Sequence, residues 1–130
     1  MVLLEACSPR HLILRGLADE LASQRDAPEN DLVLAREASA FYLKLSESVL
    51  RQTPDSLALA ETVTSGFTQY AYAFVQSEAD RIETKDASVA HRLRLRAARL
   101  YHRAQQHALY ALELQTPGFK KSLESKLPAD

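Results

Sequence analysis

The segment LAETVTSGFTQYAYAFVQSEAD, residues 59–80, decides the fold of this 130-residue chain. Its apolar residues recur every three or four positions, a spacing that predicts an α-helix rather than a strand. Two apolar stripes run along this helix. The first contains Ala60, Val63, Phe67, Tyr70, Ala71 and Phe74, and the second contains Leu59, Tyr72, Val75, Ala79 and Ile82. A helix with two apolar faces is packed between neighbouring helices.

Gly66 lies inside this predicted helix. Glycine costs about 1 kcal/mol relative to alanine in a helix interior. Close approach of another helix at Gly66 would compensate for that cost, and a tolerated kink is the alternative interpretation.

Outward from this segment, residues typical of turns divide the chain into five predicted helices. The breaks fall at residues 8–9, 25–29, 53–55, 84–88 and 116–118, and the helices cover residues 9–24, 28–52, 54–85, 87–115 and 119–126. Ser8 is expected to cap the first helix, with Pro9 at its first position. The apolar stripe of residues 87–115 is rich in alanine, so its partner helix can come close.

The composition also indicates an all-α domain. The chain has 3 Gly, 5 Pro and no Trp, which argues against a turn-dense β-sandwich, and its single Cys cannot form an intramolecular disulfide. Because 16 Lys and Arg are balanced by 17 Asp and Glu, we expect no general attraction to nucleic acid. No apolar run approaches the roughly 20 residues that span a bilayer, so any membrane association requires a lipid anchor.

Residues 36–54 and 99–117 resemble an internal repeat. Both stretches are 19 residues long, both end in Gln-Thr-Pro, and their apolar positions superpose. A repeat of long helices predicts antiparallel helical hairpins in a tetratricopeptide-like αα-solenoid of about five helices. Chance similarity is the alternative, since the 34-residue tetratricopeptide consensus is absent.

The sequence contains no recognisable catalytic or metal-binding motif. It lacks the GxGxxG, GxxxxGK[ST], HExxH and GxSxG patterns. His91, His102 and His107 lie on one predicted helix, but they are too far apart along or around its axis to share a metal. We therefore expect no enzymatic activity, no cofactor and no metal.

Four arginines form a basic rail on the helix predicted for residues 87–115: Arg92, Arg96, Arg99 and Arg103. Their spacing places them within about 60° on one helix face. A row of guanidinium groups suits an anionic ligand or an acidic partner surface. The alternative is internal pairing, because residues 55–85 carry more acids than bases and residues 86–115 show the reverse.

Aromatic residues concentrate in three consecutive predicted helices, where they either form core or line a ligand pocket. Tyr70 and Tyr72 point about 160° apart, so at least one of them is expected to face a groove or a partner. If both shared a cavity with Arg96, they would hold an apolar or carboxylate ligand. A small-molecule binding protein is therefore the alternative function.

Three blocks carry a resemblance to a known family: REASAFYLKLSESVLRQTP (36–54), LAETVTSGFTQYAYAFVQSEAD (59–80) and RAARLYHRAQQHALYALELQTPGF (96–119). They resemble TatT, the T component that accompanies TRAP (tripartite ATP-independent periplasmic) transporters. The resemblance covers residues 7–119 and the N-terminal half of the family pattern. It implies a periplasmic all-helical lipoprotein of tetratricopeptide-like hairpins, ring-like homotrimers, and a role in assisting the transporter's substrate-binding protein.

Residues 1–7, MVLLEAC, are either the remnant of a lipoprotein signal or an ordinary terminus with a free cysteine. Under the resemblance, Cys7 maps onto the lipidated cysteine, and residues 8–130 form one helical-hairpin domain. We predict a non-enzymatic periplasmic scaffold that docks a TRAP substrate-binding protein. A dimer or trimer, with residues 54–85 or 87–115 in the contact, would cover the exposed end of the helix stack.

Overall fold

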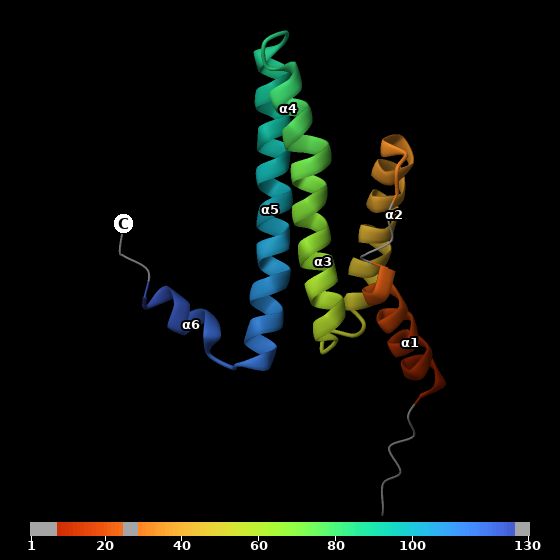
Figure 1. Ribbon diagram of the computed structural model, residues 1–130. Helices are drawn as coiled ribbons and strands as arrows, with labels where there is room; N and C mark the ends of the chain where they lie inside the picture. Colours follow the sequence, from red (N-terminus) through yellow and green to blue (C-terminus); the bar gives the residue numbers. More distant parts are fainter. Residues whose placement is uncertain (1–7, 25–28, 127–130) are drawn as a thin grey trace, which may run out of the picture.

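The computed structural model describes residues 8–24 and 29–126, which form an all-helical fold without strands. The helices are α1 (Pro9–Ser23), α2 (Leu32–Leu50), α3 (Leu57–Tyr70), α4 (Ser77–Ile82), α5 (Ala87–Gln115) and α6 (Phe119–Glu124), and a π-helical segment, η2 (Ala71–Gln76), joins α3 to α4. Because α3, η2 and α4 run on as one rod, the described residues form the five helical rods that the sequence predicts (Figure 1). Cys7 lies outside the described residues, and so does its predicted lipidation.

The beginnings of α1 and α2 differ in how they are capped. Asp31 accepts hydrogen bonds from the N–H groups of the second and third residues of α2, at 2.9 and 3.0 Å. Because the backbone of Asp31 is extended, α2 begins at Leu32 rather than near residue 28. Ser8 occupies the N-cap position of α1 and Pro9 the first helical turn, as predicted, but the Ser8 side chain makes no capping hydrogen bond.

An antiparallel pair of long rods forms the main body of the fold. Helix α5 runs beside the rod made of α3, η2 and α4 over most of its length (Figure 1). Four alanines of α5 are buried at intervals of seven residues: Ala90, Ala97, Ala104 and Ala111. Small side chains at these positions let the two rods lie close together, as the alanine-rich stripe predicts.

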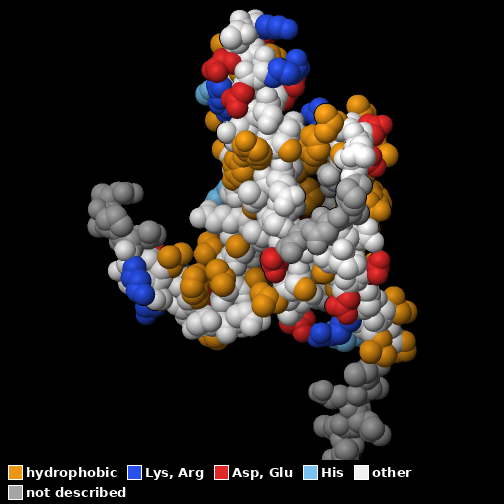
Figure 2. All heavy atoms as spheres, viewed as in Figure 1, with side chains coloured by type: hydrophobic (Ala, Val, Ile, Leu, Met, Phe, Trp, Pro, Cys, Tyr) orange, Lys and Arg blue, Asp and Glu red, His pale blue; other side chains and the backbone are white. Residues whose placement is uncertain are grey.

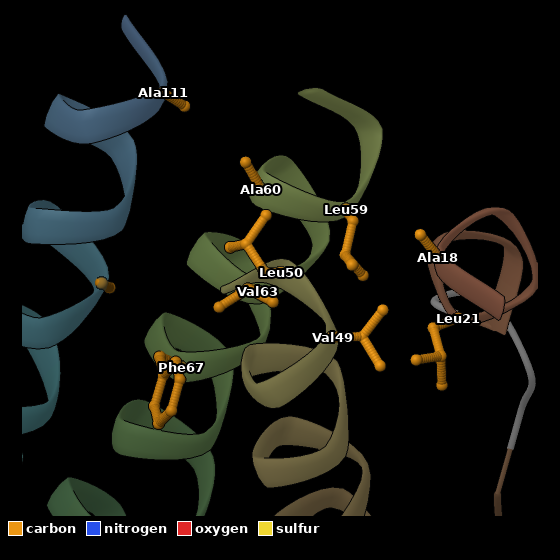
Figure 3. Packing of buried hydrophobic residues seen from close by; sticks show 10 residues of the cluster. Ala18, Leu21, Val49, Leu50, Leu59, Ala60, Val63, Phe67 and Ala111 are labelled. Carbon is orange, nitrogen blue, oxygen red and sulfur yellow. The ribbon is translucent and has the colours of Figure 1, made fainter. Parts of the chain in front are cut away.

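Helix α3 lies between its neighbours, as its two apolar faces predict. It packs against α5 and also against α1 and α2. One hydrophobic core joins these four helices (Figure 3), and its buried members are Ala18, Leu21, Val49, Leu50, Leu59, Ala60, Val63, Phe67, Ala104 and Ala111.

The π-helical segment explains much of the double stripe in the sequence. Buried residues recur every four positions along the rod: Val63, Phe67, Ala71, Val75 and Ala79. In an α-helix of 3.6 residues per turn, this spacing would drift around the axis. The wider π-helical turn reduces the drift, and its geometry is evident where the Ser77 hydroxyl and N–H both donate to the carbonyl oxygen of Tyr72. The rod thereby keeps one continuous contact surface toward α5.

Burial does not follow the internal repeat suggested by the sequence. Phe41 is 65% exposed, whereas the residue that the repeat aligns with it, Ala104, is 3% exposed. Likewise Val49 is buried and its counterpart Leu112 is exposed. Each copy of the repeat lies at the C-terminal end of a helix, α2 or α5, so the shared Gln-Thr-Pro marks where a helix ends. Equivalent apolar positions of the two copies therefore differ in whether they are buried or exposed.

Helix α6 extends away from the end of α5 (Figure 1). The turn between them depends on Gly118, whose φ of +88° lies in the left-handed region that favours glycine. The Glu113 carboxylate accepts the N–H groups of Gly118 and Lys120 at 2.8 and 2.9 Å. The turn is therefore held from α5, whereas α6 itself buries no residue.

Gly66 marks a close approach of α2 to α3. A Cβ placed on Gly66 would lie 2.5 Å from Cδ2 of Leu43, well inside van der Waals contact. This contact favours the close-approach interpretation of Gly66 over a tolerated kink.

We expect Gly66→Leu to lower the free energy of unfolding by about 1–3 kcal/mol, because overpacking against α2 outweighs the higher helix propensity of leucine. Gly16→Leu is the matched control, since Gly16 also lies in a helix but a Cβ placed on it would meet nothing within 4 Å. Urea unfolding should rank the control at or above wild type. A Gly66→Leu protein as stable as wild type would contradict the close approach.

Candidate functional site

A buried carboxylate, Glu47 of α2, forms hydrogen bonds and ion pairs with basic side chains from both α2 and α5. Its side chain is only 4% exposed. Arg103 of α5 donates to both carboxylate oxygens, with Nε 2.6 Å from Oε1. His107 Nε2 lies 2.9 Å from Oε1, and Lys44 Nζ lies 2.7 Å from Oε2. Arg51 adds a longer ion pair at 3.7 Å. Glu47 is therefore hydrogen-bonded from its own helix and from α5.

The aromatic ring of Phe67 in α3 lies beneath this cluster. The guanidinium carbon of Arg103 lies 4.9 Å from the ring centroid, in cation–π geometry. The His107 ring stacks on the same ring at 5.9 Å between centroids, with 13° between the planes. Three helices thus meet at one polar and aromatic contact.

Glu47 is ionised at neutral pH. Burial raises its pKa, but hydrogen bonds from Arg103, Lys44 and His107 outweigh burial and hold the pKa at about 2. A general acid or base would need a pKa near the working pH. The arrangement is therefore an ionised carboxylate that links α2 to α5 through Arg103 and His107.

The four arginines of the rail do not share one environment. Arg103 belongs to the Glu47 cluster, and Arg92 donates to the Ser88 hydroxyl on the same helix at 2.8 Å. Arg96 and Arg99 are exposed and form no ion pair with any residue that the structure describes. These two guanidinium groups therefore face solvent with their hydrogen-bonding capacity unused.

Internal pairing between α4 and α5 does occur, but a different arginine carries it. Arg94 Nη1 lies 2.7 Å from Glu83 Oε1, and Arg94 Nη2 lies 3.0 Å from Asp80 Oδ1. The hydrogen bonds that Arg94 donates to Glu83 and Asp80 raise its pKa. Arg94 lies outside the rail. Because Glu83 and Asp80 pair with Arg94, they do not pair with the rail residues Arg96 and Arg99.

The two tyrosines singled out by the sequence lie apart. Tyr70 lines a cavity of about 530 Å³ between α1, α2 and α3, where its ring packs against Phe74 at 5.3 Å between centroids. Tyr72 is 63% exposed and lines neither this cavity nor the neighbouring groove between α2 and α4. Arg96 lines neither of them. The structure does not bring Tyr70, Tyr72 and Arg96 into a common cavity.

Sequence reasoning did not single out Glu47, Lys44 or Arg51. Their spacing at three and four residues is visible along α2, but such pairs are common on exposed helix faces. The burial of Glu47 depends on residues 56 and 60 positions away, Arg103 and His107. No local signal in the sequence indicates this pairing.

Metal-binding groups and membrane-spanning helices are both absent from the residues that the structure describes. Across residues 8–24 and 29–126, no group of three His, Cys, Asp or Glu side chains is placed to hold a metal ion. In the same part of the chain, no helix has the length and apolar character needed to cross a membrane. The distinctive polar features of the described residues are the Glu47 cluster and the two exposed rail arginines, Arg96 and Arg99.

Glu47 should make the stability of the protein depend on acid. Its pKa is about 2 when folded and ordinarily 4.5, so the unfolded chain takes up the proton first as pH falls. The stabilisation is complete above about pH 5 and is lost as pH falls toward about 2. Its size is at most about 3 kcal/mol.

In Glu47→Gln we expect a lower free energy of unfolding at pH 7 and a flatter pH dependence between about pH 5 and pH 2, since this linked proton is gone. Urea unfolding at each pH measures both effects. Glu124→Gln is the control, because Glu124 is exposed on α6. Equal pH profiles for wild type and Glu47→Gln would rule out the stabilising role of the cluster.

Comparison with known proteins identifies the family. The TAtT family, described as TRAP transporter T-component, matches residues 28–130. An uncharacterized protein of Treponema pallidum (strain Nichols) is 32% identical over 97 residues. The aligned region is 75% of this chain and 30% of that protein, so the chain spans about a third of its relative's length. No solved structure matches the chain. Because the family match covers most of the chain and includes the three quoted blocks, the protein belongs to the TRAP transporter T-component family.

Proposed function

We propose that the protein is a non-enzymatic helical scaffold of a TRAP transporter and docks the transporter's substrate-binding protein in the periplasm. The observation that carries this proposal is the family match over residues 28–130. The Glu47 cluster supports it, because a low-pKa carboxylate inside an ion-pair network is suited to holding helices in place.

The arrangement of the helices supports a tetratricopeptide-like architecture. Helices α1 and α2 form a first pair, and the rod of α3, η2 and α4 forms a second antiparallel pair with α5 (Figure 1). Consecutive helix pairs that pack on one another are the unit of an αα-solenoid. We therefore infer a short stack of two pairs, with α5 at one end.

The outer end of this stack is apolar. Hydrophobic side chains gather over the C-terminal part of α5 and on α6 (Figure 2), and Leu112 of α5 and Leu123 of α6 are exposed. Exposed apolar patches of this kind commonly mark contact surfaces. This supports a homo-oligomer, dimer or trimer, with α5 in the contact.

We expect light scattering at about 100 micromolar to give two or three times the 14.5 kDa mass of one chain. Leu112→Lys should shift the population toward monomer, because it places a charge at an exposed apolar position of α5. The matched control is Ile13→Lys, which charges an exposed apolar position on α1. A monomeric wild-type protein would exclude self-association under these conditions.

Lipid anchoring through Cys7 is part of the proposal. It rests on the family resemblance and on the position of Cys7 before Ser8 and Pro9. The anchor would hold the scaffold at the membrane surface beside the transporter.

A second candidate function is the binding of a small apolar molecule. The cavity of about 530 Å³ between α1, α2 and α3 favours it, because Tyr42, Tyr70 and Phe74 are among the residues that line it. The rail arginines line no part of this cavity, so a carboxylate ligand would lack that anchor. In this candidate Tyr70→Ala removes ligand binding and leaves protein docking intact.

The test of the docking proposal is capture of the purified substrate-binding protein of the same transporter by the immobilised full chain. We expect a complex at tens of micromolar, a range typical of transient contacts, both with and without transported ligand. An immobilised unrelated helical protein of similar net charge is the control. Absence of a complex in both ligand conditions would refute the docking function.

A further inference from the structure

One line of side chains runs along α5 and is left uncovered over much of its length. Tyr110 and Leu114 follow the rail residues Arg92, Arg96, Arg99 and Arg103 on the same helix face. Successive members of this line are three, four or seven positions apart, and each of these spacings returns to the same side of an α-helix. Tyr110 is 50% exposed and Leu114 is 46% exposed. The line is therefore cationic in its first part and apolar toward the end of α5.

Helix α2 adds positive charge beside this line. Lys44 of α2 and Arg51, the residue directly after α2, reach the buried carboxylate of Glu47, while Arg103 reaches it from α5. The three cationic side chains remain 42% to 62% exposed, whereas that of Glu47 is 4% exposed. We call the six cations the cationic strip: Lys44, Arg51, Arg92, Arg96, Arg99 and Arg103.

The cationic strip carries more positive charge than its own acids neutralise. Glu47 is the acid that the described ion pairs place within the strip, and it is inaccessible from outside. Arg96 and Arg99 have no acidic partner among the described residues. On a chain whose formal net charge is −1, this face is a local excess of positive charge.

The exposed guanidinium and apolar side chains of this face indicate which kind of partner could bind it. Exposed guanidinium groups pair with carboxylates in bidentate geometry, and Tyr110 and Leu114 offer apolar contact on the same line. From Arg92 to Arg103 the strip extends about 16 Å, which is the length of three helical turns. An acid-rich helix with apolar residues at one end would match both parts.

We propose that the cationic strip, with Tyr110 and Leu114, is the docking surface for an acidic amphipathic helix on the partner protein. This inference rests on the proposed docking function and names the surface and partner chemistry that it uses. The strip follows α5, with Lys44 and Arg51 beside it, and ends in the apolar side chains of Tyr110 and Leu114, which fits a protein helix better than a flat anionic bilayer.

The direct test uses the full chain and a fluorescein-labelled helical peptide of about 18 residues, or five helical turns, with glutamates on one face of its first three turns and leucines on that face afterwards. We expect binding by fluorescence anisotropy at about 50 mM salt, weakened at least about tenfold in Arg96→Glu/Arg99→Glu. The matched control Lys121→Glu/Lys126→Glu makes the same change in net charge on exposed residues outside the strip, and should weaken binding less than about twofold.

Circular dichroism and melting temperature establish that both double variants fold. Equal weakening by both variants would overturn the strip, because only net charge would then matter. Binding of the chain to phosphatidylglycerol vesicles but not to the peptide would also overturn it, in favour of a membrane surface.

The substrate-binding protein separates this inference from the docking function. If it binds wild type and Arg96→Glu/Arg99→Glu equally, the strip is wrong while docking stands. If the peptide binds through the strip and the substrate-binding protein does not bind at all, the strip stands while the proposed function fails. Loss of both bindings only in the strip variant supports both.

Discussion

The buried carboxylate of Glu47 is the contact on which the arrangement of the helices depends. A desolvated charge is costly unless it is fully paired, so its partners must be in place whenever the chain is folded. Those partners come from its own helix, α2, and from α5, and Phe67 of α3 lies beneath them. The cluster thereby links α2 to α5 across α3.

The need to pair the buried Glu47 carboxylate also affects the charge of the protein surface. Pairing one buried carboxylate with Lys44, Arg51 and Arg103 draws more positive charge to this face than the carboxylate offsets. The acids that could neutralise α5 from the neighbouring rod, Asp80 and Glu83, pair instead with Arg94 on another side of the helix. The structural contact and the proposed docking surface are thus two consequences of one distribution of charge.

Two backbone features allow the close contacts of the helical rods. The π-helical turn of η2 keeps residues spaced by four directed toward α5, so the antiparallel contact continues from α3 through α4. At Gly66 the absence of a side chain lets Leu43 of α2 lie against α3. Together these features let α3 pack against α2 on one side and α5 on the other.

The sequence by itself determined the helices and the family, because periodicity, turn residues and motif order are local properties. The alanine stripe of α5 and the position of α3 between neighbours followed from the same patterns. Only the tertiary structure decided that Glu47 is buried, that Arg103 pairs with it, and that Tyr70 and Tyr72 face different surroundings. The Glu47 pairing joins residues 56 positions apart, and a helical pattern shows which residues share a face but not which faces meet.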